Sequence, residues 1–120
     1  MANTFKRKVS QGIGTSATAI GGYTVGAGTQ TTVIGLTCAN VTTTAVTVDV
    51  ILNDGTNNTY IVKGATVPSG GSLVVVGGDQ KVVLEPNDSV TVTASTASSV
   101  DAIMSILEIS YWVSRKSLQR

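Results

Sequence analysis

The chain contains no histidine and only one cysteine, so it lacks the side chains on which many catalytic and metal sites depend. Histidine is the commonest general base and metal ligand near neutral pH, and structural zinc sites are built from Cys and His clusters. We therefore expect no metal site and no cofactor. The single Cys38 cannot form an internal disulfide, and its apolar sequence neighbours predict a small buried side chain.

Acidic residues are the remaining candidates for catalysis, and there are seven of them. Two could form a carboxylate pair for glycoside hydrolysis, but Asp54, Asp79 and Asp88 fall in expected turns, where Asp is favoured for backbone reasons. Segment 53–58 faintly resembles a calcium loop, yet it lacks the alternating acids and the closing Glu. No set of nucleophile, base and orienting group can be assembled, so we expect the chain not to be an enzyme.

Aromatic residues make up only 4% of the chain, and the helix formers Glu, Gln, Arg and Met are scarce, whereas Val and Thr are abundant. β-Branched side chains fit the pleated surface of a sheet, so strands are favoured almost everywhere. The N-terminal residues do not resemble a secretory signal, and no apolar run reaches membrane-spanning length. We expect no membrane partner.

From residue 30 onward, short stretches of alternating apolar and polar residues are separated by turn signals, which is typical of an antiparallel sandwich or barrel. Asn53-Asp54-Gly55 predicts a tight hairpin, and Gly77-Gly78 predicts a chain reversal. In the first stretch, Ile34, Leu36 and Cys38 are expected on one face. The strands are predicted over 31–39, 45–52, 59–63, 73–76, 81–84, 89–94 and 100–109.

The last predicted strand is apolar on both of its faces. One face carries Val100, Ala102, Met104 and Ile106, and the other carries Ile103, Leu107 and Ile109. Such a strand is either central between two layers or covered by a neighbouring subunit.

These patterns predict an all-β fold, an antiparallel, jelly-roll-like β-sandwich of seven to eight strands over residues 23–109. Residues 1–22 are rich in Gly, Ser, Thr and Ala and are expected to form an extended N-terminal arm. Only 23–25 reads as a strand within the first 29 residues. Residues 110–120 form a short C-terminal appendage, either a short helix or another arm.

Positive charge gathers at both ends of the sequence, while the body between them carries seven acids against two lysines. Three charges per end are few for phosphate contacts, so nucleic acid is not the expected partner, and docking on acidic protein neighbours is favoured. Tyr111 and Trp112 could anchor an interface or cover the chain's own sandwich. The residues expected to contact other proteins are Phe5, Lys6, Arg7, Lys8, Tyr111, Trp112, Arg115 and Lys116.

The succession of these motifs resembles a family of small tailed-bacteriophage virion structural proteins, such as those of cyanophages. The motifs that carry the resemblance lie within about residues 20–109 and are Tyr23-Thr24-Val25, Thr32 to Leu36, Val46 to Val50, Asn53-Asp54-Gly55, Tyr60 to Lys63, Val67-Pro68, Gly77 to Lys81, Val83 to Glu85, Asp88 to Val90 and Leu107 to Ile109.

The resemblance implies a head decoration (cement), neck or tail accessory protein, located in the virion and assembled in the host cytoplasm. Its partners would be the major capsid protein or neck and tail proteins, and decoration is the favoured position. The continuation from Tyr111 to Arg120 departs from the family pattern. A closed homo-oligomer, with a trimer favoured, would cover the two-sided last strand. The alternative is a host-glycan binding module on a fibre or baseplate.

Overall fold

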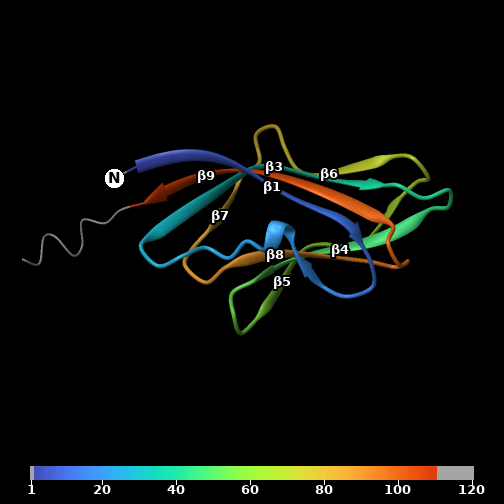
Figure 1. Ribbon diagram of the computed structural model, residues 1–120, viewed down its shortest axis with the longest axis horizontal. Coiled ribbons are helices and arrows are strands. Elements are labelled where there is room, and N and C mark those ends of the chain that lie inside the picture. Colours follow the sequence, from blue (N-terminus) through green and yellow to red (C-terminus); the bar gives the residue numbers. More distant parts are fainter. Residues whose placement is uncertain (1, 111–120) are drawn as a thin grey trace, which may run out of the picture.

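The computed structural model describes residues 2–110, and Figure 1 shows them as two packed layers of strands. These residues form nine strands and one short 3₁₀ helix, η1 (Ile20–Gly22), which lies between β2 and β3. The strands are β1 (Ala2–Ile13), β2 (Thr18–Ala19), β3 (Thr29–Asn40), β4 (Val46–Asn53), β5 (Asn58–Val67), β6 (Ser72–Val76), β7 (Val82–Leu84), β8 (Ser89–Ala94) and β9 (Val100–Ser110).

The strand order makes the fold an antiparallel β-sandwich of jelly-roll type. One sheet has the order β1-β9-β3-β6, with β7 also paired to β3, and the other has the order β2-β8-β4-β5. If β6 and β7 are taken as one interrupted strand, the eight strands follow two nested Greek keys, in which consecutive strands change sheet except at the β4–β5 hairpin. The predicted fold class is confirmed.

The core between the sheets consists of aliphatic side chains from alternate positions of both layers. The five-stranded sheet contributes Leu36, Met104 and Ile106, and the four-stranded sheet contributes Val50 and Val92, all at most 1% exposed. The predicted inward face of the strand 100–109 is confirmed, because every second residue from Val100 to Ile106 is buried. The same alternation buries every second residue from Val46 to Val50 and from Val90 to Ala94. Few aromatics are needed, since interdigitating Val and Ile fill the space.

Four loops meet at one end of the sandwich, where they bond to one another through main-chain groups. Val41 N donates to Ser99 O, and Ser99 N donates to Ile13 O, each at 2.9 Å. The buried Asn40 amide donates to the carbonyl oxygens of Thr44 and Val67 at 2.8 and 3.0 Å. These bonds close the end of the sandwich, and every buried side-chain nitrogen or oxygen of residues 2–110 has a hydrogen-bond partner.

The expected N-terminal arm is wrong over residues 2–13, which form the edge strand β1. β1 pairs antiparallel with β9 from Ala2↔Ser110 to Ile13↔Val100. The sequence of this strand is largely polar and therefore did not indicate a strand, because an edge strand does not need apolar residues on both faces. A bulge after Ser10, with Gly12 at φ 62°, shifts the register so that Ile13 is buried.

Three local predictions are also corrected by the structure. A register shift between Val33 and Gly35 displaces Ile34, so Val33 is buried on the face predicted for Ile34. Residues 23–25 are not a strand. The chain does not reverse at Gly77-Gly78, because β6 and β7 are both antiparallel to β3. Residues 77–81 instead form a loop that rises from the five-stranded sheet (Figure 1).

Candidate assembly surface

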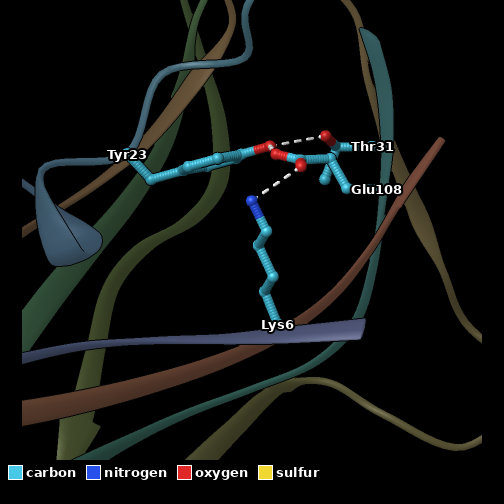
Figure 2. Close-up of polar contacts among 4 residues, drawn as sticks. All are labelled: Lys6, Tyr23, Thr31 and Glu108. Carbon is cyan, nitrogen blue, oxygen red and sulfur yellow. Dashed lines mark hydrogen bonds and ion pairs between the residues drawn. The ribbon is translucent and has the colours of Figure 1, made fainter. Parts of the chain in front are cut away.

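A polar cluster ties the edge strand β1 to the body of the sandwich (Figure 2), and we call these four residues the latch: Lys6, Tyr23, Thr31 and Glu108. The Tyr23 hydroxyl donates to Glu108 Oε2 at 2.6 Å and lies 2.7 Å from Thr31 Oγ1. Lys6 Nζ contacts Glu108 Oε1 at 2.9 Å. The Glu108 carboxylate thus joins β9 to β1 and to the loop before β3, and the Tyr23 hydroxyl joins that loop to β3.

The environment of the latch sets the charge of its members. Burial, followed by the hydrogen bond to Glu108, raises the pKa of Tyr23 to about 12. The hydrogen bonds from Tyr23 and Lys6 lower the pKa of the Glu108 carboxyl. At neutral pH the latch therefore holds a neutral phenol against an ionised carboxylate, so Tyr23 is unsuited to act as a base or nucleophile.

The basic residues of β1 divide between the two faces of the strand. Lys6 belongs to the latch, and Lys8 Nζ lies 5.0 Å from the centre of the Tyr23 ring. Phe5 and Arg7 point the other way, since β1 alternates, and Phe5 is 75% exposed. Sequence reasoning grouped all four as contacts to other proteins. Lys6 and Lys8 contact their own chain, and contacts of Phe5 and Arg7 with other proteins stay a prediction.

The other residues expected at an interface are Tyr111, Trp112, Arg115 and Lys116, and these lie outside the described residues. The alternative of a host-glycan binding module would draw on exposed aromatic side chains, and Tyr23 is buried in the latch. The Tyr60 ring is exposed on β5, with Lys63 Nζ 4.6 Å from its centre.

The side of the five-stranded sheet that faces away from the core is unusually apolar, and we call it the outer face. Cross-strand pairing places Phe5 beside Leu107 and Val9 beside Ile103. Five of the seven large exposed apolar residues of the described chain lie on it. They are Phe5, Val9, Val74, Val83 and Ile103. An apolar sheet face of this kind marks an interaction surface.

The outer side of the four-stranded sheet shows the opposite chemistry. Its outward positions are mostly polar, and Asp49 pairs with Thr93 and Thr47 with Thr66 across neighbouring strands. This is the ordinary alternation of a sheet with one solvated face. The two outward sides of the sandwich thus differ in chemistry: the outer face is apolar, and the outward side of the four-stranded sheet, which we call the threonine-rich face, is polar.

The outer face is hollowed where β1 and β9 meet near the bulge. The hollow has a volume of about 320 Å³, and its lining includes Arg7, Val9, Asp101 and Ile103. Asp101 Oδ1 accepts a hydrogen bond from Gly12 N at 2.9 Å, which fixes the carboxylate on this face. The ion pair among residues 2–110 is Lys6 with Glu108, so neither Arg7 nor Asp101 has an ionic partner there.

Sequence reasoning missed the outer face as a whole, although it noted the second apolar side of the strand 100–109. The alternation Phe5, Arg7, Val9 was a usable signal, because in a strand these three side chains share a face. It was not used because the segment was interpreted as an arm.

Within residues 2–110, no group of three or more His, Cys, Asp or Glu side chains is placed to hold a metal ion. No helix of the described part is long and apolar enough to cross a membrane. The four residues of the latch satisfy one another's polar groups.

Comparisons with known proteins find shared architecture at low sequence identity. A chain from the disulfide-linked pili of Bacillus endospore appendages is 16% identical, with a TM-score of 0.53 over 90% of this chain and 88% of that one. A chain from the acid-stable capsid of Helicobacter pylori bacteriophage KHP30 is 12% identical, with a TM-score of 0.52 over 92% and 95%. At these identities the likeness shows the fold. No family model and no curated protein matches the sequence.

Proposed function

We propose that this chain is a non-enzymatic structural protein of a bacteriophage particle, which decorates the capsid by binding neighbouring shell proteins. The observation that carries the proposal is the apolar outer face of the five-stranded sheet. A domain that worked alone in water would be expected to present a polar surface there. A building block of an assembly buries such a face against its neighbours.

The architecture supports the same proposal. The jelly roll is a common fold of viral shell proteins, and the similarity to the phage KHP30 capsid chain extends over nearly the whole of both chains. The sequence motifs independently resemble small virion proteins of tailed phages. The proposed partners are the major capsid protein and further copies of this chain, and the proposed location is the virion.

A pilus subunit is the competing structural role, and the cysteine argues against it. The Bacillus pili are described as disulfide-linked, whereas Cys38 is the one cysteine of this chain and is fully buried in β3. Burial raises the pKa of its thiol to about 11, which disfavours the reactive thiolate. Cross-linking through Cys38 would require the sandwich to open.

We expect Cys38 to resist a thiol reagent in the folded protein. Incubation with an aromatic disulfide at pH 8 should give no labelling within the time that labels the urea-unfolded chain completely, because exchange needs an accessible thiolate. Mass spectrometry of the intact chain measures the outcome. Rapid stoichiometric labelling of the folded protein would show that Cys38 is available and would restore a disulfide-linked assembly as a possibility.

The decoration role is tested on the particles of the phage that encodes this chain. Quantitative mass spectrometry of gradient-purified particles should find the chain in many copies. Particles from a deletion strain should still assemble but release DNA at a lower temperature than intact particles. Absence of the chain from purified particles would contradict the proposal, and failure of the deletion strain to form shells would contradict decoration in favour of a main shell role.

A further inference from the structure

We infer that the outer face of the five-stranded sheet is a two-fold interface that binds a second copy of this chain. The inference goes beyond a virion role, because it names the occupant of the face and holds for the free protein. It depends on three features of the outer face, namely its apolar centre, its rim and the arrangement of its two charges.

The centre of the interface is the cross-strand pair Val9↔Ile103, which lies in the hollow between β1 and β9. Both side chains are exposed, Ile103 to 53%. Phe5 and the half-buried Leu107 extend the apolar surface along the same two strands. Sheets that stack face to face do so through such rows of aliphatic side chains, about 10 Å apart.

The size of the face fits a dimer. Four adjacent strand positions about 4.8 Å apart, with strands of about ten residues at about 3.3 Å each, give a surface on the order of 600 Å². Specific interfaces bury about 800 Å² per partner, so the outer face with its rim is of the required order. The loop 77–81 rises beside it and supplies polar residues at the border, including Asp79 and Lys81 (Figure 1).

The charges select a second copy as the partner. Arg7 precedes Val9 by two residues on β1, and Asp101 precedes Ile103 by two residues on β9. Because the strands are antiparallel, the two charges lie on opposite sides of the central pair, about 13 Å apart along the strands at about 3.3 Å per residue. Neither is in an ion pair within residues 2–110.

Consider a two-fold axis that lies in the plane of the interface, perpendicular to the strands and directly over the pair Val9↔Ile103. Rotation about this axis stacks the two outer faces and exchanges the end that carries Arg7 with the end that carries Asp101. It brings Arg7 of each copy over Asp101 of the other, so that two ion pairs flank the apolar centre. A surface that complements itself in this way is the requirement for an isologous dimer. An acidic partner would pair with Arg7 but repel Asp101, and a purely apolar partner would bury both charges unpaired.

The test is the mass of the purified chain by light scattering and sedimentation at concentrations up to about 100 μM. The wild type should sediment as a dimer. Ile103→Glu should raise the dissociation constant at least about 30-fold, as expected for a central interface residue. Tyr60→Glu is the matched control, because Tyr60 is 47% exposed but lies on β5, in the other sheet. This variant should remain a dimer.

Charge reversal tests the two-fold arrangement separately. Arg7→Asp should dissociate the dimer because it places acids opposite one another, and the double variant Arg7→Asp, Asp101→Arg should restore it. Circular dichroism shows that each variant is folded.

A monomeric wild type would overturn the inference, as would equal effects of Ile103→Glu and Tyr60→Glu. A trimer dissociated by Ile103→Glu would overturn the two-fold arrangement. A monomer that dimerises only after removal of 111–120 would show that the chain's own C-terminal segment covers the face. None of these results bears on whether the chain is found in virions, which is measured on the particles.

Discussion

Replacing Ile106 by alanine is expected to lower the free energy of unfolding by about 2–5 kcal/mol, the usual cost of removing a large aliphatic side chain from a packed core. Ile106 is 1% exposed and lies on β9, between β1 and β3 in the five-stranded sheet. Its side chain points toward the four-stranded sheet, so the deleted atoms leave a cavity between the layers. Urea denaturation followed by circular dichroism measures the change.

Ile103→Ala is the matched control for this prediction, since it makes the same chemical change on the same strand. Ile103 is on the outer face, so its replacement should change the free energy of unfolding by less than about 0.5–1 kcal/mol. Both variants should be measured at low protein concentration, where association does not contribute to stability. Equal losses in the two variants would contradict the assignment of inner and outer faces.

Replacing Tyr23 by phenylalanine is expected to cost about 1–3 kcal/mol at pH 8, because the change removes a hydrogen bond to an ionised carboxylate and leaves the buried Thr31 hydroxyl without its phenol partner. The loss should be measured by urea denaturation. Tyr60→Phe is the control, because Tyr60 is exposed and its hydroxyl makes no hydrogen bond to residues 2–110. It should change stability by less than about 0.5 kcal/mol.

The latch should also give the protein a specific dependence on alkaline pH. The pKa of Tyr23 is raised to about 12 in the folded chain, above about 10 for an unfolded tyrosine. The stabilisation of the neutral phenol is therefore fully present below pH 10 and is lost as the pH rises from 10 to 12. The difference in the free energy of unfolding between wild type and Tyr23→Phe should narrow by about 1 kcal/mol between pH 10 and 11. If the free energies of unfolding of wild type and Tyr23→Phe changed in parallel with pH, the fold would not be holding Tyr23 neutral.

The central strands could be predicted from the sequence because both of their faces follow simple rules. Val46, Val48 and Val50 alternate with polar residues, and all three are buried. Asn53-Asp54-Gly55 lies at the β4–β5 turn, where Gly55 adopts φ 96°, as a tight reversal requires. The strand 100–109, which is apolar on both sides, is the central strand β9. One side faces the core, and the other side lies on the outer face and is not covered by another layer of the described chain.

The edge strand and the latch could not be predicted in the same way. β1 gains its strand conformation from pairing with β9, about 100 residues later in the sequence, and nothing local to Phe5 or Lys6 specifies that pairing. The ion pair of Lys6 with Glu108 depends on the same long-range register. Bulges at Ser10 and Val33 add single-residue shifts that reverse the alternation, which a period of two cannot anticipate.

The measurement that tests the proposed role most directly is cryo-electron microscopy of the intact particle, with the jelly roll traced into the density. We expect density for many copies on the capsid lattice, with the outer face of the five-stranded sheet covered by a neighbouring subunit and the threonine-rich face toward solvent. A particle whose capsid, neck and tail are fully explained by other chains, with no density that fits this sandwich, would contradict the account.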